Sequence, residues 1–444
     1  MYIPELKAFL NIDNGLLINL NNMDFFKLEK EYLNVLTKKI NNNNLNFREQ
    51  DLYNEIYENC VINEEEKTKV SLDEITSVKI HVSNDCNLRC SYCYANKGNY
   101  GGKSTIMSYE DGKKIAKIIK EKLCNIQNIL FFGGEPLLAI SAIEAICEEF
   151  YGKQINFLMQ TNGTIYNEKV HEIIEKYKIN VTVSIDGPKE IHDIHRVYPN
   201  GNGSYDIILK NVKSFNKNKE NISFVQSTYT KQSSTLTKDQ IAKKIYDEFN
   251  IPRVYVGEVH TNDKNIEVNY TTPNMKELAK NFFEDVKLEK FNDSLHIKAI
   301  LSSLLSKNRS SYFCNAGASQ ISIDYKGDIY PCQLFNNKEK YKMGNIYDEV
   351  ISINEKLQSV KNNLHFINKS TNNLCSNCIA NFWCRKCLGT SISKNGEILI
   401  SKDDCNLNKE ITYEVLKQFI NLITNDNYND FICKFEKIYS MELI

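Results

Sequence analysis

The chain has 444 residues, of which 42% are hydrophobic and 25% charged, a composition typical of a globular protein with a full apolar core. Its net charge of -1 at pH 7 shows no excess of basic residues of the kind typical of nucleic-acid-binding proteins, so we expect no nucleic-acid partner. The length allows two or three domains.

Two missing features predict where the protein works. Residues 1–20 include Glu5, Lys7 and Asp13 and lack the apolar core of a secretory signal. No apolar run approaches the roughly 20 residues that a membrane span needs. We therefore expect a cytoplasmic protein with no membrane partner. In such a reducing compartment the 14 cysteines predict metal-bound thiolates rather than disulfides.

Residues 1–75 are expected to form a separate domain. Apolar runs at 9–12 and 16–20 flank Asp13-Asn14-Gly15, which is a hairpin signal. Helical patterns follow over residues 24–40 and around 50–59. This order resembles the winged-helix peptide-recognition domain found ahead of many peptide-modifying enzymes. The resemblance implies that a leader peptide binds as an added strand on an exposed sheet edge; a plain N-terminal cap is the alternative.

Apolar strands and amphipathic helices alternate between residues 76 and 305. Helical patterns such as 109–123 and 140–151 separate the strands, and this alternation predicts an α/β domain with parallel strands. Six units are too few to close an eight-stranded barrel. In barrels built from alternating parallel strands and helices, the catalytic residues collect at the C-terminal ends of the strands. The expected strands are 78–83, 128–133, 155–161, 180–185, 221–229 and 253–259.

Three cysteines directly follow the first of these strands. Cys86, Cys90 and Cys93 have the spacing C-x3-C-x2-C, and the aromatic Tyr92 precedes the last of them. Three close thiolates can bind three irons of one [4Fe-4S] cube, which leaves the fourth iron free for a small molecule. The alternatives are a zinc knuckle, which would want a fourth ligand nearby, and three unrelated thiols.

This stretch resembles the signature of the radical S-adenosylmethionine (radical SAM) enzymes. The resemblance implies a partial (β/α)6 TIM barrel whose [4Fe-4S] cluster binds S-adenosylmethionine. Reduction by one electron then yields a 5′-deoxyadenosyl radical. It also implies a low-potential electron donor such as flavodoxin or ferredoxin.

The ends of the later strands carry the expected cofactor contacts. The second strand runs into Gly133-Gly134-Glu135-Pro136, which is similar to the GGEP motif of the same family. Two glycines let the backbone approach a ligand closely, and Glu135 would face the ammonium of the methionine part. The resemblance assigns the remaining contacts to Tyr92, Asn162, Ser184, Asp186 and Arg196.

Turn capping is the alternative for the Asn, Ser and Asp residues among these contacts. His192 and His195 lie close by in the sequence and are expected at the surface or as caps.

A second cysteine-rich region lies within residues 306–444. Cys314 and Cys332 bracket a hairpin-like turn at 324–328. Together with the cysteines that follow, they resemble the SPASM extension of peptide-modifying radical SAM enzymes, which binds auxiliary Fe-S clusters. This sequence departs from the commonest form of the extension at Cys384 and Cys387, which have the spacing C-x2-C instead of C-x3-C. A zinc ribbon is the alternative for the whole cysteine set. The later cysteines are Cys375, Cys378, Cys384, Cys387 and Cys405.

The resemblance implies two auxiliary [4Fe-4S] clusters with unequal ligand sets. One set is complete, with Cys375, Cys378, Cys384 and Cys405. The other has only Cys314, Cys332 and Cys387, so that one iron lacks a thiolate. Since iron favours soft sulfur, that iron could bind a substrate thiolate; solvent, a histidine or Cys433 are the alternatives.

The leading hypothesis is a maturase that joins a cysteine sulfur to a carbon in a ribosomally made precursor peptide with a leader. The first alternative is an anaerobic sulfatase-maturating enzyme, which shares the SPASM spacing and makes formylglycine. The second is a non-catalytic Fe-S or zinc protein, which would not need the cofactor-pocket motifs. No catalytic acid or base is singled out.

Overall fold

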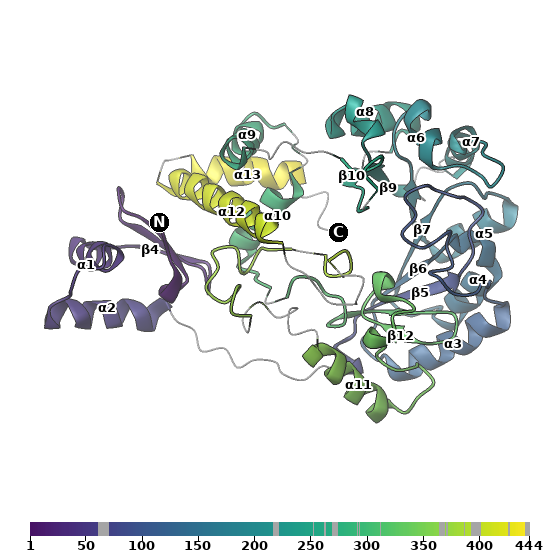
Figure 1. Ribbon diagram of the computed structural model, residues 1–444, viewed down its shortest axis with the longest axis horizontal. Helices are drawn as coiled ribbons and strands as arrows, with labels where there is room; N and C mark the ends of the chain where they lie inside the picture. The colour runs from purple at the N-terminus through teal and green to yellow at the C-terminus, as the bar shows by residue number, and fades with distance from the viewer. Residues whose placement is uncertain are drawn as a thin grey trace. The chain divides into compact units, whose positions relative to one another are not determined.

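The structure is a computed structural model with two compact units (Figure 1). The terminal unit comprises Met1–Lys67, Thr271–Cys314 and Leu364–Ile444, and the sheet unit comprises Thr68–Tyr270 and Asn315–Asn363. The predicted domain limits at 75/76 and 305/306 remain predictions. The described residues are 1–60, 71–215, 222–251, 253–261, 263–268, 274–290, 292, 294–310, 312–363, 369, 372–385, 387–391, 401–424 and 427–439.

Six parallel strands form the centre of the sheet unit, each paired with the next along the chain. Their interior side chains, such as Ile80, Phe131 and Val181, are fully buried. The expected α/β class with a mostly parallel sheet is confirmed. The strands are β5 (Ser77–Ser83), β6 (Asn128–Gly133), β7 (Asn156–Thr161), β8 (Asn180–Ser184), β9 (Ile222–Tyr229) and β10 (Val254–Glu258).

Amphipathic helices separate these strands along the chain. In the first helix Ile115, Ala116 and Ile119 bury one face, as the 3.6-residue period requires. Figure 1 shows the helices on the outer side of the strands. They are α3 (Tyr109–Lys122), α4 (Ile140–Glu149), α5 (Glu168–Tyr177), α6 (Lys189–His195), α7 (Tyr205–Phe215) and α8 (Lys238–Phe249). A further helix of this unit, α11 (Val350–Asn363), comes later in the chain and separates none of the six strands.

The hairpin expected at residues 324–328 is confirmed, and it also extends the parallel sheet. Strand β11 (Gln320–Ile323) pairs antiparallel with β12 (Ile329–Tyr330). The turn is closed by Asp324, whose Oδ1 accepts hydrogen bonds from two backbone N–H groups of the turn. Strand β11 also pairs in parallel with β5, so the sheet has the order β10-β9-β8-β7-β6-β5-β11-β12.

The N-terminal part of the terminal unit is a four-stranded antiparallel sheet followed by two helices. The strands are β1 (Tyr2–Ile3), β2 (Ala8–Asn11), β3 (Leu16–Asn19) and β4 (Asp24–Lys27), and the helices are α1 (Lys30–Ile40) and α2 (Phe47–Cys60). The predicted hairpin is confirmed. The winged-helix expectation remains a prediction.

The helix expected over 24–40 is wrong in its first turn. Residues Asp24–Lys27 form β4, which pairs with β3, and the helix begins only at Lys30. Phe25 and Phe26 suit a strand as well as a helix, and tertiary pairing decides between the two.

Both faces of the middle strands β2 and β3 are buried within the terminal unit. Phe9 and Ile18 pack against later helices of the unit, while Leu10 and Leu17 pack against α1 and α2. This alternation follows from the two-residue period of a strand. The later helices are α9 (Met275–Lys287), α10 (Leu295–Ser306), α12 (Lys402–Ile423) and α13 (Tyr428–Tyr439). Across the parts of the chain that the structure describes, no helix has the length and apolarity needed to cross a membrane.

Candidate active site at the strand ends of the sheet unit

The first cysteine loop leaves the C-terminal end of β5 and is joined at once to the end of β6. Gly134 N–H donates to Ser83 O at 2.8 Å, and Glu135 N–H donates to Asp85 O at 2.8 Å. A Cβ on Gly133 would collide with Ser83 O, and Gly133 also has a φ of +135° that glycine favours. The glycines therefore permit close approach of the GGEP turn to the cysteine loop itself.

The far side of the cysteine loop is held by the end of α6. Arg89 N–H donates to Val197 O at 2.7 Å, and Ser91 N–H donates to His195 O at 3.2 Å. Ser91 Oγ lies 2.6 Å from His195 Nδ1, while His195 Nε2 lies 3.1 Å from Thr230 Oγ1. This imidazole thus links the loop to the residue that follows β9.

The two histidines do not lie at the surface, but the capping alternative holds for His192, whose Nδ1 accepts a hydrogen bond from Asp186 N–H at 3.3 Å. His192 and His195 are both buried. A buried imidazole needs hydrogen-bond partners, and hydroxyl groups from distant segments supply them. Ser204 Oγ lies 3.0 Å from His192 Nε2. Burial lowers the pKa of His192 to about 4, so its ring is neutral at pH 7.

Three of the predicted cofactor residues form one buried cluster. Asp186 Oδ2 accepts hydrogen bonds from Arg196 Nε at 2.9 Å and from the hydroxyl of Tyr92. Its Oδ1 accepts from the Thr228 N–H on β9 at 2.9 Å. Burial raises the pKa of Tyr92 well above its usual value, so the phenol keeps its proton and remains a donor. The cluster fixes Tyr92 beside the cysteines.

Glu135 is 0% exposed and joins the ends of β6 and β7. Its carboxylate accepts hydrogen bonds from Leu137 N–H at 3.0 Å, Thr161 Oγ1 at 2.6 Å and Asn162 N–H at 2.8 Å. Burial raises its pKa to about 7 despite these donors. The carboxylate therefore caps the short 3-10 helix Pro136–Ala139 as well as lying at the strand ends.

Asn162 connects the end of β7 to the cysteine loop. Its Nδ2 donates to Asn87 Oδ1 at 2.9 Å and lies 3.7 Å from Cys86 Sγ. Its Oδ1 accepts from Thr164 N–H, which is the turn-capping arrangement. Ser184 is the last residue of β8 and is also buried. Sequence reasoning missed Asn87 and Thr161, which give no motif signal because their partners lie on other strands.

The first three cysteines suit an iron–sulfur cluster. Cys86, Cys90 and Cys93 are free thiols and partly buried, and Leu88 N–H donates to Cys86 Sγ at 3.4 Å. Burial, together with the nearby negative charges of Glu135, Cys90 and Cys93, raises the pKa of Cys86 to about 12. Such a group needs a cationic partner to ionise, which a cluster supplies.

No three cysteine, histidine or acidic side chains among the described residues converge as one metal ion would require. The thiolates of a four-iron cube each bind a different iron, so their sulfurs do not meet at one point.

Four of the later cysteines also lie together, in the terminal unit. Two tight turns bring three of them close: Cys378 N–H donates to Cys375 O at 3.0 Å, and Cys384 N–H donates to Ala380 O at 2.7 Å. Cys405 lies in the first turn of α12. Burial raises the pKa of Cys384 to about 11, a shift that Lys369 opposes and that the charges of Cys375, Cys378 and Cys405 support.

The surroundings of this four-cysteine set also suit an anionic cluster. The buried indole N–H of Trp383, next to Cys384, has no hydrogen-bond partner among the described residues. Burial lowers the pKa of Lys369 to about 8, while the neighbouring thiolates oppose this change. A buried donor and a buried ammonium both favour a negatively charged neighbour.

The remaining set, Cys314, Cys332 and Cys387, is divided between the two units. Cys314 and Cys387 belong to the terminal unit and Cys332 to the sheet unit, so this set remains a prediction. Cys433 is exposed on α13.

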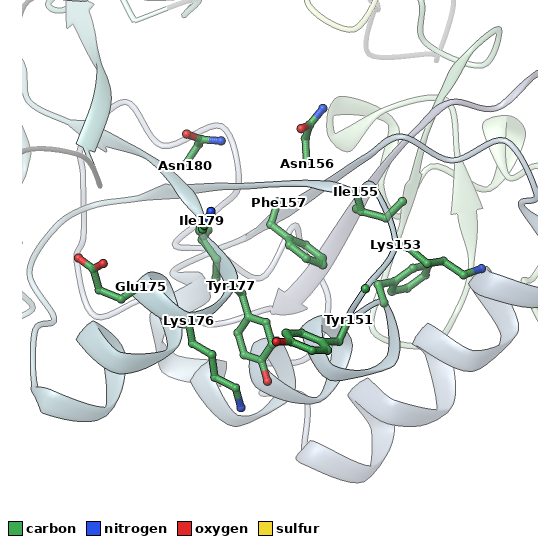
Figure 2. Close-up of a pocket in the computed structure, with 13 residues that line it drawn as sticks. Tyr151, Lys153, Ile155, Asn156, Phe157, Glu175, Lys176, Tyr177, Ile179 and Asn180 are labelled. Carbon is green, nitrogen blue, oxygen red and sulfur yellow. The ribbon is translucent and has the colours of Figure 1, made fainter.

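A surface hollow of about 700 Å³ lies at the opposite ends of the strands from the first cysteine loop. It is lined by residues that precede or begin β7 and β8, including Asn156 and Asn180 (Figure 2). Figure 2 shows Tyr151 and Tyr177 close together in this hollow, with ring centroids 6.3 Å apart. None of the predicted site residues lines it.

Comparisons with known proteins agree with this geometry. The radical SAM superfamily model matches residues 80–230, and the SPASM iron-sulfur cluster-binding model matches residues 314–379. The radical SAM cyclopropyl synthase TigE of Paramaledivibacter caminithermalis is 25% identical over 94% of this chain and 92% of its own length. A cysteine-type anaerobic sulfatase-maturating enzyme of Clostridium novyi is 29% identical over 67% of this chain and 83% of its own.

An uncharacterized Methanocaldococcus jannaschii protein is 41% identical, but over only 33% of this chain and 51% of its own length. Among solved structures, anSMEcpe with bound AdoMet has a TM-score of 0.62 at 24% identity, covering 79% of this chain and 100% of its own. Streptococcus suis SuiB bound to S-adenosylmethionine has a TM-score of 0.55 at 16% identity, covering 90% and 98%.

These structures share the fold. The family matches fall on the first cysteine loop with its strand ends and on the first part of the later cysteine region. The chain is therefore a radical SAM enzyme with a SPASM domain, a family whose cofactors are a [4Fe-4S] cluster with S-adenosylmethionine and auxiliary Fe-S clusters.

Proposed function

We propose that this enzyme matures a ribosomally made precursor peptide by forming a thioether between a cysteine sulfur and a peptide carbon. The observation that carries the peptide assignment is an exposed edge strand with two aromatic side chains in a chain that matches the radical SAM and SPASM families. Phe25 and Phe26 on β4 are 45% and 38% exposed.

In this proposal Cys86, Cys90 and Cys93 bind the cluster that carries S-adenosylmethionine. When bound and reduced by one electron, that cofactor supplies a 5′-deoxyadenosyl radical that removes a hydrogen atom from the substrate. Glu135 would provide the negative charge near the cofactor's ammonium group, and Asp186 and Arg196 would be among the polar groups that contact its ribose and carboxylate.

Tyr92, Asn162 and Ser184 complete the polar wall of this site. Tyr92 is held by its hydrogen bond to Asp186, and Asn162 by its contacts with the cysteine loop. The wall orients the cofactor, and the burial of its side chains keeps water away from the reacting carbon.

Strand β4 is the proposed docking edge for the leader of the precursor. It is the last strand of the sheet order β1-β2-β3-β4, so one side of its backbone has no strand partner within that sheet. An extended peptide can pair with such an edge, and aromatic side chains give it a surface to pack on. SuiB has been solved bound to its precursor peptide SuiA and shares the fold, with a TM-score of 0.54 at 17% identity.

The predicted auxiliary cysteine sets support the choice of thioether formation. The proposed set of Cys314, Cys332 and Cys387 leaves an iron that can bind the substrate thiolate. The balanced change transfers one hydrogen atom from the peptide carbon to the 5′-deoxyadenosyl radical, which becomes 5′-deoxyadenosine, and releases one proton from the thiol. An oxidised auxiliary cluster, for which Cys375, Cys378, Cys384 and Cys405 would be the ligands, would accept the one electron that remains when the carbon–sulfur bond forms.

Cyclopropane formation is a second candidate, favoured by the match to TigE over 94% of this chain. This reaction would also remove two hydrogen atoms, so mass alone does not distinguish the two products. It would leave every cysteine thiol of the peptide free.

The test uses the anaerobically reconstituted full chain and a cysteine-containing precursor peptide encoded beside it. We expect a product that lacks two hydrogen atoms and has one fewer thiol that iodoacetamide can alkylate. A Cys→Ala peptide should remain unmodified. Continued dehydrogenation of that peptide would favour the cyclopropane, and formylglycine or no peptide product would overturn the proposal.

The leader-docking step is tested separately with the double variant Phe25→Ser and Phe26→Ser. Its KM for the leader-bearing peptide should rise, while cleavage of S-adenosylmethionine without peptide stays unchanged. Tyr57→Ser, which alters an exposed aromatic residue on α2, is the matched control. Point variants are preferable to deletion, because removal of β2 and β3 would uncover the core packed around Phe9.

A further inference from the structure

Lys369 is a buried lysine at the four-cysteine set of the terminal unit. Its side chain is fully buried, with 0% exposure. The ammonium donates to Cys384 O at 3.3 Å and lies 5.6 Å from the centre of the Phe313 ring. Asn381 Nδ2 donates both to Lys369 O, at 3.2 Å, and to Cys375 O, at 2.6 Å. Side chain and backbone of Lys369 are thus each tied to one predicted ligand.

A buried ammonium needs more compensation than one carbonyl and one ring provide. Removing a charge from water costs several kcal/mol unless an opposite charge is close. Among the described residues no carboxylate forms an ion pair with Lys369. The thiolates of the four-cysteine set are the negative groups beside it.

Two other cations near these cysteines differ from Lys369 in one respect. The positive charge of Lys409 favours the thiolate forms of Cys375 and Cys378. The positive charge of Arg385 disfavours the charged form of Lys369. Both Lys409 and Arg385 are exposed. Water screens an exposed charge strongly, whereas a buried charge acts through a medium of low dielectric constant. Lys369 is therefore the cation with the largest expected effect on a cluster bound here.

We propose that Lys369 is the counter-cation of the auxiliary cluster bound by Cys375, Cys378, Cys384 and Cys405, and that it raises the reduction potential of this cluster. The inference rests on the ligand set of the proposed function. A four-iron cluster with four thiolates gains one negative charge when it is reduced. A neighbouring buried cation stabilises the reduced form more than the oxidised form, which favours acceptance of the electron left by bond formation.

The test is an EPR-monitored redox titration of the full chain. To isolate the auxiliary signals, each variant is made in a background in which Cys86, Cys90 and Cys93 are replaced by Ala. Lys369→Met should make reduction of the cluster at least tenfold less favourable, which is a downward shift of about 59 mV for one electron. Lys369→Arg should restore the parent potential. Lys409→Met, the matched exposed control, should change the equilibrium less than threefold.

An equal change in Lys369→Met and Lys409→Met, with the iron content retained, would overturn the proposal. If Lys369→Met loses iron, Lys369→Gln is titrated instead, with the same criteria. Loss of iron from both neutral variants but not from Lys369→Arg would support the requirement for charge, and loss from all three would overturn it. If the ligand assignment itself is wrong, Cys375→Ala will remove no iron. This result distinguishes an error in the ligand set from an error in the role of Lys369.

Discussion

The first cysteine loop and the four-cysteine set of the terminal unit both use thiols, but they differ in the number of thiols and in the charges beside them. The loop places three thiols within eight residues at the strand ends, beside the carboxylates of Glu135 and Asp186 and the guanidinium of Arg196. The four-cysteine set gathers thiols from two turns and a helix around one buried cation, Lys369.

The difference indicates two separate roles, cofactor binding at the first cysteine loop and electron exchange at the four-cysteine set. Three thiolates leave one iron open, and a wall with charges of both signs suits a ligand with an amino and a carboxylate group. Four thiolates close every iron, so the cluster can exchange only electrons, and a buried cation adjusts how readily it does so. Each prediction below tests one side of this contrast.

The largest expected effect is that of Cys90→Ala in the first loop. Without this thiolate the cluster that carries S-adenosylmethionine should be lost, and with it the reductive release of 5′-deoxyadenosine. The measurement is anaerobic incubation with dithionite and chromatography of the nucleoside. Cys124→Ala, which alters an exposed cysteine outside both sets, should keep the full rate. Full release by Cys90→Ala would exclude the assigned ligands.

Cys375→Ala should distinguish the role of the four-cysteine set from that of the first cysteine loop. We expect about four fewer irons per chain, since one cube is lost. Release of 5′-deoxyadenosine should persist, but no dehydrogenated peptide should form, because the electron acceptor is missing. Iron analysis and mass spectrometry of the peptide provide the two readouts. An unchanged peptide yield would show that this set is not needed for the reaction.

Asp186→Asn tests the polar wall of the first site. It removes the ion-pair partner that Arg196 has at 2.9 Å, and breaking a buried ion pair of this kind costs about 3–5 kcal/mol. We expect a lower denaturant midpoint and weaker binding of S-adenosylmethionine. The exposed pair Lys243–Asp247 supplies the control, since Asp247→Asn should change stability by less than about 1 kcal/mol. Equal midpoints for the two variants would contradict the assigned role.

The smallest effect concerns the pH dependence of stability. Glu135 has a pKa of about 7 when folded, above its ordinary value of 4.5, so the folded chain binds the extra proton between these pH values. Its contribution to stability is therefore lost as pH rises from 4.5 to 7, by at most about 1.4 kcal/mol per pH unit.

Glu135→Gln should remove this slope while the contributions of the buried histidines remain. Denaturant titrations at several pH values between 5 and 8 measure the difference between variant and parent. Parallel curves for the two proteins would mean that the carboxyl does not titrate in this range.

The sequence was most informative where the pattern is local. The strands β5 to β10 lie close to their expected limits, because alternation of strands and helices leaves a signal in each segment. The cysteine spacings are also a local signal, and the ligand sets that they indicate remain predictions.

Features that depend on distant partners could not be predicted. The pairing of β11 with β5 joins segments far apart in the chain, and neither carries a signal for the other. The burial of His195 depends on Ser91 and Thr230, and the compensation of Lys369 depends on cysteines that follow it. Strand β4 was missed because Phe25 and Phe26 fit a helical pattern until β3 is placed beside them.

The central claim is that the iron left open by Cys86, Cys90 and Cys93 binds S-adenosylmethionine. The most direct test is the EPR spectrum of the reduced, anaerobically prepared full chain, recorded with and without this cofactor. We predict that its addition changes the cluster signal in the parent protein and in Cys375→Ala, but not in Cys90→Ala. A parent spectrum that stays the same when the cofactor is added would contradict the claim.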